Sequence, residues 1–259
     1  MGEILNATNL PKTTVYGHIY DIPLSAKTKR KIKKEATTRL NNYIKKERKG
    51  KCLPGRNFLK PSQWSHELIF IISHFLFDGR IKHEGCEYYN RSDYLIEAVR
   101  TAVKNLLGLD SKIYKRKFGV KQIRYYNVEL GIYAEEKAKE LFKYIKTASL
   151  QEKKVFLRSF FDDEGSVYIY KNIRLVRGFQ HNLLILKLIE KLLKDFNIES
   201  RIDEKYKEII IGRKENLIRF REKINFSEGI CINHHRKNSV WKQSLEKREI
   251  LDKAINSYL

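Results

Sequence analysis

Apolar residues dominate two nine-residue stretches of the chain, and each stretch ends in an acidic residue followed by a glycine. They are residues 71–79 (IISHFLFDG) and residues 157–165 (LRSFFDDEG), which share a serine at the third position. Because apolar residues would lie on every side of such a helix, the pattern predicts two buried helices. A strand-like stretch follows each helix, at residues 80–82 and 166–170.

The small residues of both stretches predict how the helices pack and where they end. Ser73 and Ser159 occupy matching positions, where a small side chain lets a second helix approach closely. Gly79 and Gly165 fit the residue just past a helix end, where a left-handed backbone suits glycine. We therefore expect each helix to end directly after its acidic residue.

The two acidic residues, Asp78 and Glu164, lie at the expected C-terminal ends of these helices. An acid is unfavourable there because the helix dipole is negative at that end. Two acids side by side are worse, since like charges raise each other's pKa. A divalent cation would remove the repulsion, and hard oxygen ligands that leave room for water and phosphate point to Mg²⁺. One or two such ions can activate water and stabilise the leaving oxygen in phosphodiester hydrolysis.

Residues 157–165 closely resemble the LAGLIDADG signature of homing endonucleases, and residues 71–79 resemble its looser variants. The resemblance implies an α/β (α+β) fold of two pseudo-symmetric halves, with the motif helices at their interface and antiparallel DNA-binding sheets. It also implies that the acids are catalytic and bind metal, and the implied metal site comprises Asp78, Glu164, Gly79 and Gly165. One such stretch alone is equally well explained by a buried helix that ends in a turn, but two in matching context favour the motif.

Two further acids of the second stretch have no counterpart in the first. Asp162 matches the signature, but Leu76 occupies the equivalent position of the first stretch. Asp163 stands where the resembled family usually has a small residue. We therefore expect both acids to be local capping or solvated residues rather than required metal ligands.

From Trp64 onward the chain runs through the same order of predicted elements twice. The first copy is predicted as the motif helix, a strand at 86–90, a helix at 93–107, a loop at 108–114, a strand at 122–130 and a helix at 134–145. The second copy is predicted as the motif helix, strands from 167 and at 175–180, a helix at 183–196, a loop at 197–203, a strand at 208–211 and a helix at 215–224. The segments 111–113 (SKI) and 200–202 (SRI) repeat at almost the spacing of the two acids, which supports duplication. A closing helix is predicted at 241–259.

Alternation along the predicted strands turns one face of each sheet to the core and the other to solvent. Ile81, Val167 and Ile169 would then pack inward. In the resembled family such sheets form a saddle in the major groove, where outward side chains support base reading. The DNA-binding candidates are Arg80, Lys82, Lys121, Gln122, Arg124, Tyr168, Tyr170, Lys171, Arg177 and Arg201. For each of them, a solvated surface role stays open.

Strong positive charge is the main feature of the composition. The formal net charge is +22, from 53 Lys and Arg against 31 Asp and Glu, and the pI is 9.8. A chain this basic is expected to meet a polyanion, with nucleic acid the leading choice. Cys52, Cys86 and Cys231 form neither a zinc pattern nor a disulfide framework, which favours a reducing interior. No apolar stretch is long enough to cross a membrane and no signal peptide is visible, so we expect a cytoplasmic protein at DNA, or an organellar one if encoded there.

The N-terminal segment, residues 1–24, contains a run that resembles the turn and recognition helix of helix-turn-helix proteins. This run covers residues 10–19 (LPKTTVYGHI). In such a motif the recognition helix enters a DNA groove. The side chains that would then lie near a groove are Thr13, Thr14, Tyr16 and His18.

Residues 25–62 form a predicted basic linker or arm between this segment and the repeats. Apolar residues recur within it at helical spacing, which predicts a basic amphipathic helix, while a solvated linker is the alternative. Either form would bind phosphate without reading sequence. The two halves are assigned to residues 63–147 and 148–259.

A basic cluster at residues 234–237 (HHRK) follows the last predicted repeat helix. In the resembled family a basic residue near the active site orders water or stabilises charge on phosphate. Lys237 is the catalytic candidate for that role, with Lys214 as the second choice. A phosphate-contacting patch is the alternative, and adjacent histidines without cysteine partners argue against zinc.

The resemblance implies a monomeric, site-specific double-strand DNA endonuclease that uses Mg²⁺, with Mn²⁺ able to substitute. The chain has neither the leading nucleophile nor the final Asn of a splice junction, so we expect an intron-encoded or free-standing protein rather than an intein. Two other classes stay open. One is an intron RNA maturase or a DNA-binding regulator on the same fold, and the other is an unrelated basic RNA-binding protein.

Overall fold

The computed structural model describes residues 25–48, 58–232 and 241–258, together with positions 6, 7, 9, 11, 13–15 and 23. Contacts divide the chain into two compact units, Met1–Pro54 and Gly55–Leu259. No helix in the described part of the chain combines the length and the apolar composition needed to cross a membrane.

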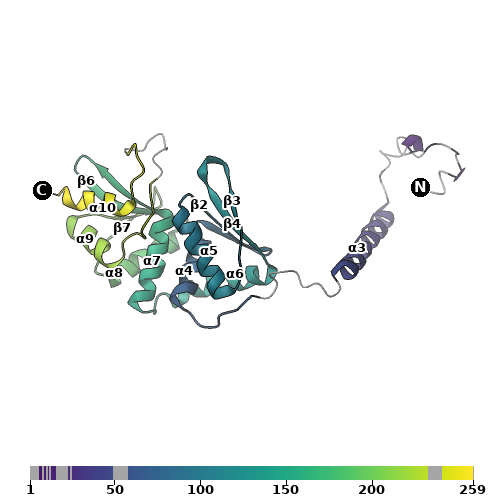
Figure 1. Ribbon diagram of the computed structural model, residues 1–259, viewed down its shortest axis with the longest axis horizontal. Helices are drawn as coiled ribbons and strands as arrows, with labels where there is room; N and C mark the ends of the chain where they lie inside the picture. Colours follow the sequence, from purple (N-terminus) through teal and green to yellow (C-terminus); the bar gives the residue numbers. More distant parts are fainter. Residues whose placement is uncertain are drawn as a thin grey trace. The chain divides into compact units, whose positions relative to one another are not determined.

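The first unit contains helix α3, Ala26–Arg48, which confirms the predicted basic helix over the irregular linker (Figure 1). The hydroxyl of Ser25 accepts a hydrogen bond from the backbone N–H of Thr28 at 3.1 Å, as at a helix N-cap. The described side chains of α3 are exposed, including the lysines and arginines from Lys27 to Arg39. Of the predicted helix-turn-helix residues, Tyr16 and His18 lie outside the described residues.

The first half of the second unit begins with the first motif helix and contains one four-stranded sheet. Its elements are α4 (His66–Phe77), β1 (Gly79–Lys82), β2 (Gly85–Asn90), α5 (Asp93–Leu107), β3 (Ile113–Lys115), the 3₁₀ turn η1 (Lys117–Gly119), β4 (Lys121–Tyr126) and α6 (Val128–Tyr144). The strands are antiparallel, in the order β1-β2-β4-β3.

The second half repeats this plan. Its elements are α7 (Leu150–Glu164), β5 (Gly165–Tyr170), β6 (Ile173–Phe179), α8 (Leu183–Asp195), β7 (Arg201–Asp203), β8 (Glu208–Ile211), α9 (Lys214–Lys223) and α10 (Lys247–Asn256). The antiparallel order β5-β6-β8-β7 matches the first sheet strand for strand. The predicted duplication and the predicted fold of two similar halves are therefore confirmed.

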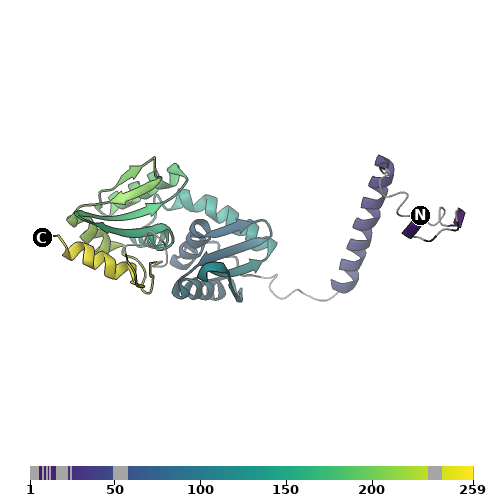
Figure 2. The ribbon, with the colours of Figure 1, turned by 90° about the horizontal axis from the view of Figure 1, so that it is seen from above.

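The motif helices α4 and α7 pack against each other where the halves meet. In the second unit helices pack against each sheet, α5 and α6 in the first half and α8 and α10 in the second (Figure 2). Ser73 and Ser159 are both buried in α4 and α7, as their small size predicted. Ile72, Phe75 and Leu157 are among the fully buried apolar side chains of these two helices.

The two motif glycines do not have the left-handed backbone that the sequence predicted. Gly165 is extended, with φ −87° and ψ 155°, and Gly79 is not among the residues with positive φ. A Cβ atom on Gly79 would lie 2.6 Å from the carbonyl oxygen of Phe75, and one on Gly165 would lie 2.3 Å from that of Phe161. Glycine is needed at both positions because any side chain there would clash with the backbone of the preceding helix. A left-handed backbone conformation is not the reason.

Several predicted boundaries also differ, and side-chain caps explain two of them. The strand predicted at 122–130 ends at Tyr126, because the side chain of Asn127 accepts a hydrogen bond from the backbone N–H of Leu130 at 3.0 Å and starts α6. The closing helix begins at Lys247 rather than at 241. Glu246 and Glu249 form a capping box at that end.

Candidate functional site

The structure brings the two motif acids together at the junction of α4 and α7. Asp78 directly follows α4, and Glu164 is the last residue of α7. Burial, followed by repulsion from Asp163 and Glu164, raises the pKa of Asp78 to about 8. Burial, followed by repulsion from Asp163, raises the pKa of Glu164 to about 7. The two predicted catalytic acids thus share one electrostatic environment, in which each resists ionisation.

Asn90, at the end of β2, holds the carboxylate of Asp78. Its side-chain N–H₂ donates to Asp78 Oδ2 at 3.0 Å and to Asp163 Oδ1 at 3.2 Å. Its side-chain oxygen accepts a hydrogen bond from the backbone N–H of Ser92 at 2.9 Å, which fixes the orientation of the amide. Asn90 therefore positions one acid from each half, a role that the sequence did not reveal.

The side chain of Asp163 is fully buried, so the prediction that it is a capping or solvated acid was wrong. Its Oδ2 lies 2.7 Å from Nδ1 of His74 on the other motif helix, and its Oδ1 accepts a hydrogen bond from the hydroxyl of Tyr88 at 2.7 Å. A buried carboxylate is tolerated when such partners satisfy it. Its partners come from the first half, so they cannot be seen in the local sequence.

Asp162 is also buried, which contradicts the same prediction. Its Oδ1 accepts a hydrogen bond from the backbone N–H of Ser227 at 2.8 Å. Burial raises its pKa, and the hydrogen bonds from Ser227 act in the opposite direction. Asp162 thereby attaches the end of α7 to the segment that follows α9.

Lys247, at the start of α10, is the basic residue of this site, and the sequence analysis missed it. Its buried ammonium donates to the carbonyl oxygens of Asp162 at 2.7 Å and Phe161 at 3.2 Å, and it lies 5.3 Å from the ring centre of Phe226. Burial lowers its pKa, while the surrounding acids act to raise it. One signal was available: Lys247 shares the apolar face of α10 with Ile250, Leu251 and Ala254.

Of the two basic residues predicted for this role, the structure describes only Lys214. Lys237, with the rest of the cluster at 234–237, lies outside the described residues. The ammonium of Lys214 donates to the backbone carbonyl of Tyr258 at 3.3 Å. That contact ties the start of α9 to the C-terminal end of α10.

The site gathers four carboxyl groups, and such a cluster suits a divalent metal. In the part of the chain that the structure describes, Asp78, Asp162, Asp163 and Glu164 all interact with the buried ammonium of Lys247, while Arg91 also acts on Asp78 and Arg158 on Asp162. Carboxylates are the hard ligands that Mg²⁺ prefers, with water and substrate phosphate completing its shell. Among the described residues, no group of three or more His, Cys, Asp or Glu side chains is arranged to hold a metal. The acids therefore fit an ion that keeps most of its ligands from water and phosphate.

One family model matches part of the chain: the model of a LAGLIDADG-like domain matches residues 151–225. Those residues run from α7 to just past α9 and include Asp162, Asp163 and Glu164. They form a LAGLIDADG-like domain. The first half has the same strand order as this domain and supplies the other motif helix.

Several solved structures have a similar fold. One is a crystal structure of I-DmoI in complex with DNA and Mn, with 16% identity over 63% of this chain and 98% of that chain, and a TM-score of 0.47. Another is the N-terminal LAGLIDADG domain of WhiA, with 19% identity over 65% and 87% of the two chains, and a TM-score of 0.49. Full-length WhiA from Thermatoga maritima shares 17% identity over 76% and 62%, with a TM-score of 0.49. At these identities and scores the likenesses transfer neither substrate nor activity. No curated protein matches the chain significantly.

The strand register shows which DNA-binding candidates of the first half share the sheet face opposite the helices. Arg80, Lys82 and Arg124 lie on this face, around the carboxylate of Glu87. Gln122 is on the same face but fully buried, and its side-chain oxygen accepts a hydrogen bond from Arg116 at 2.7 Å.

Lys121 does not share this face. It pairs with Asn90 and lies on the helix side of the sheet, where its ammonium forms an ion pair with Asp93 at the start of α5. Alternation accounts for the difference, because a single residue step along a strand changes the face.

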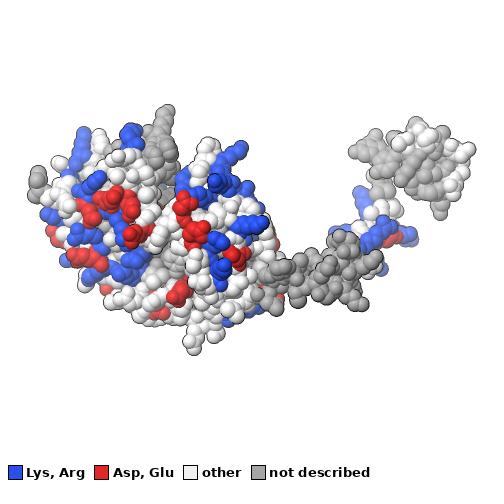
Figure 3. Space-filling model, in the orientation of Figure 1, with Lys and Arg blue, Asp and Glu red and all other residues white. Residues whose placement is uncertain are grey.

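In the LAGLIDADG-like domain, four candidates share the sheet face opposite the helices. They are Tyr168, Tyr170, Arg177 and Arg201. The guanidinium of Arg177 stacks on Tyr168 at 4.6 Å and lies 3.4 Å from Glu208. Lys171 is in the turn between β5 and β6, with its ammonium 5.5 Å from the ring centre of Tyr170. Figure 3 shows lysine and arginine side chains on the visible face of both halves, interspersed with acidic ones.

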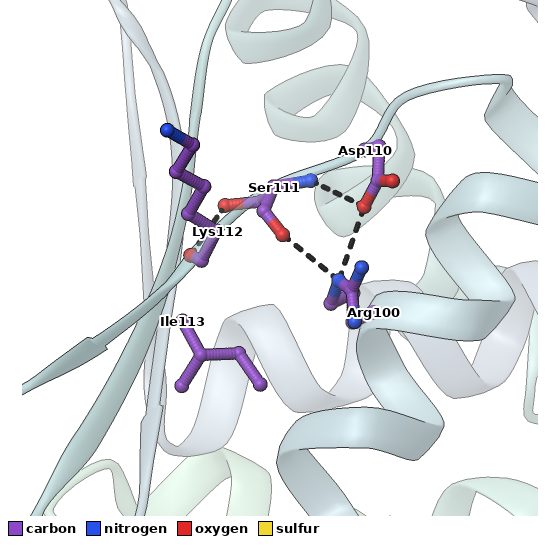
Figure 4. Close-up of a pocket in the computed structure, with 5 residues that line it drawn as sticks. All are labelled: Arg100, Asp110, Ser111, Lys112 and Ile113. Atoms are coloured by element: carbon purple, nitrogen blue, oxygen red, sulfur yellow. Dashed lines mark hydrogen bonds and ion pairs between the residues drawn. The ribbon is translucent and has the colours of Figure 1, made fainter.

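A cavity of about 500 Å³ lies away from the acids, between α5 and β3 (Figure 4). It is lined by Arg100, Asp110, Ser111, Lys112 and Ile113. The guanidinium of Arg100 donates to Asp110 at 3.0 Å and to the carbonyl oxygen of Ser111 at 2.8 Å. These polar groups bind one another and fix the loop after α5, which is a structural role.

Proposed function

We propose that this protein is a site-specific double-strand DNA endonuclease that uses a divalent metal. The observation that supports it most is the pair of partly buried acids with raised pKa values, one from each of two equivalent halves. A twofold arrangement of this kind suits an object with two antiparallel strands. The proposal includes action as a monomer at intracellular DNA.

Asp78 and Glu164 would hold the metal, and Gly79 and Gly165 are proposed beside them. A bound Mg²⁺, or Mn²⁺ in its place, would supply an activated water and stabilise the leaving oxygen of the phosphodiester. The chain's own groups prepare this site: Asn90 orients the carboxylate of Asp78, and Lys247 offsets part of the negative charge. Burial of the acids at the helix junction makes their interaction with a cation stronger than it would be in water.

The basic surface supports duplex DNA as the substrate. A net charge of +22 favours association with a polyanion. Arg80 and Arg124 on the first sheet, with Arg177 and Lys171 in the second half, are the proposed contacts that position or read DNA. Helix α3 would add phosphate contacts that carry no sequence information.

A DNA-binding regulator or an intron RNA maturase is the second candidate. Lys247 favours it, because a buried ammonium hydrogen-bonded at the end of α7 reduces the need for a metal to hold the acids together. Such a protein would bind a specific nucleic acid and leave it intact. Its function would survive Asp78→Asn and Glu164→Gln.

Selection from a randomised duplex library tests the proposal directly. The full chain is incubated with the library in Mg²⁺ or in chelator, beside Glu164→Gln and the matched control Glu199→Gln at an exposed ion pair of the same half. We expect one long site to be cut on both strands, only with metal. Glu164→Gln should lose at least about 100-fold in rate, as removal of one group that stabilises transition-state charge does elsewhere, and Glu199→Gln should cut normally. Specific binding without cleavage would favour the regulator or maturase instead.

The role of α3 is tested by the salt dependence of binding. Lys27, Lys31 and Lys34 lie on one face of α3 by helical spacing. Replacing all three by glutamine should lower the slope of log K against log salt by up to about 3, if each contacts one phosphate. A slope equal to that of the unmodified chain would remove α3 from the DNA interface.

A further inference from the structure

The two sheets can be compared residue by residue, because their strand pairings are the same. Gly79 pairs with Tyr88 in the first sheet, and Gly165 pairs with Gly178 in the second. Tyr88 in turn pairs with Ile123. Gly178 in turn pairs with Ile209. Counting along the strands from these pairs gives every equivalent position on the faces opposite the helices.

Equivalent positions on these faces differ in chemistry. Lys82 of the first sheet corresponds to Tyr168, and Arg124 corresponds to Ile210. The first face is lined by Arg80, Lys82, Glu87, Tyr89, Tyr114, Gln122, Arg124 and Tyr126. The second face is lined by Tyr168, Tyr170, Ile173, Leu175, Phe179 and Ile210, and its polar positions are Ser166, Arg177, Arg201, Asp203 and Glu208. The first face therefore carries mainly charged and polar side chains, and the second carries a larger share of aliphatic and aromatic ones.

Part of the apolar face is open to solvent. Tyr170 is 49% exposed, Ile173 47% and Phe179 37%. Large apolar side chains gathered on one exposed face indicate a surface that binds something. An antiparallel sheet otherwise presents polar residues on its solvated side.

Cations border this apolar face at both ends of the strands. Lys171 lies in the turn between β5 and β6, and Lys205 and Lys207 lie between β7 and β8. Arg177 and Arg201 lie on the face itself. An apolar centre with a cationic border complements a duplex groove, where base edges form the floor and phosphates form the rims. The same border would be unfavourable against a cationic or apolar partner.

We propose that the second sheet recognises thymine methyl groups, so that the half of the target beneath it is rich in A·T pairs. In the major groove the C5-methyl of thymine is the apolar group that a side chain can contact. Arg80, Lys82 and Arg124 of the first sheet offer hydrogen-bond donors instead, which suit guanine edges. The target is therefore asymmetric in composition, although the protein is nearly symmetric in fold. This inference rests on the proposed function for its ligand, duplex DNA, but not on cleavage.

The test uses the full-length Glu164→Gln protein and the duplex that it enriches from a randomised library. Thymines in each half of that duplex are replaced in turn by deoxyuridine, which lacks only the methyl group. Each contacted methyl removed should raise the Kd about 3- to 4-fold, the value of one buried methyl. Thymines in the other half should change the Kd by less than about 1.5-fold on the same scale.

A variant assigns the sensitive half to the second sheet. Ile173→Ser changes an exposed side chain, so the fold should be retained. It should bind the thymine and deoxyuridine duplexes with nearly equal Kd. The matched variant Tyr126→Ser, on the exposed edge of the first sheet, should keep the full difference.

Each outcome has a distinct meaning. Equal deoxyuridine effects in both halves, or none, would overturn the methyl recognition while leaving the proposed function intact. A methyl effect that Ile173→Ser leaves unchanged would also overturn it. Failure to enrich any duplex would overturn it together with the proposed function, whereas tight binding without cleavage by the unmodified chain would remove only the endonuclease.

Discussion

The two halves make the same contact across their interface with opposite chemistry. The fourth motif residue of α4, His74, lies 2.7 Å from the seventh of α7, Asp163. The fourth motif residue of α7, Phe160, packs edge to face on the seventh of α4, Phe77, with ring centres 5.2 Å apart. One contact is a buried polar pair, and its symmetric counterpart is an aromatic pair.

The strand beneath each contact is adapted to it. On the polar side Tyr88 of β2 donates its hydroxyl to Asp163. At the equivalent position of β6 the chain has Gly178, where a Cβ would lie 2.4 Å from the ring of Phe160. Tyr88 fills the space beside the smaller polar pair, whereas Gly178 leaves room for the two phenyl rings. The total packed volume is therefore similar on the two sides. The same backbone arrangement thus accepts either a polar or an aromatic contact, provided that all the partners of that contact are present.

The largest expected effect comes from breaking the polar contact. Asp163→Ala should lower the free energy of unfolding by about 4 kcal/mol, because it leaves buried polar partners without their acceptor. His74→Phe, Asp163→Phe and Tyr88→Gly together copy the aromatic side and should cost less than the single change. Urea unfolding measures both, with the exposed Asp252→Ala as control. A triple variant with a lower free energy of unfolding than Asp163→Ala would show that the polar and aromatic contacts are not interchangeable.

Removal of Lys247 should be the next largest effect, because its ammonium is buried and hydrogen-bonded to the end of α7. Lys247→Met deletes the donor to two carbonyl oxygens of α7 and a charge that offsets the acids, which should cost about 3 kcal/mol. Lys253→Met, also in α10 but stacked on Trp241 near the surface, should stay within about 0.5 kcal/mol. Equal losses in the two variants would rule out a special role for Lys247.

The last comparison concerns the acids of the two halves and their response to pH. Folding raises the pKa of Asp78 from 3.8 to about 8 and that of Glu164 from 4.5 to about 7. The folded state therefore holds protons that the unfolded state releases, so this stability is complete below about pH 4 and is lost as the pH rises through the folded values. Without metal, the Tm should fall by roughly 10 °C or more between about pH 5 and 8, because pKa shifts of this size are worth several kcal/mol.

The two acids should separate in that experiment. Asp78→Asn should remove the part of the decline near pH 8, and Glu164→Gln the part near pH 7. Added Mg²⁺ should raise the Tm of the unmodified chain most at high pH, where both carboxylates are ionised. A Tm that does not change with pH in the chelated protein would contradict the raised pKa values of the two acids.

Local patterns in the sequence were enough to predict most elements and the two motif acids. The helix predicted at 93–107 and the strand predicted at 208–211 have those bounds in the structure. Apolar periodicity and capping residues such as Ser92 act over a few residues, so they can be read along the chain. The duplication was also visible, because both copies keep the order of their elements.

The tertiary structure alone decided how the site is completed. The partners of Asp163 lie on α4 and β2, and the cation near both acids comes from α10. It also placed Lys121 on the helix side of its sheet and buried Gln122. The motif determined which acids meet, since each lies at the end of a locally encoded helix. Which buried charges satisfy them depends on contacts between residues far apart in the sequence, because packing of the two halves brings those residues together only in the folded chain.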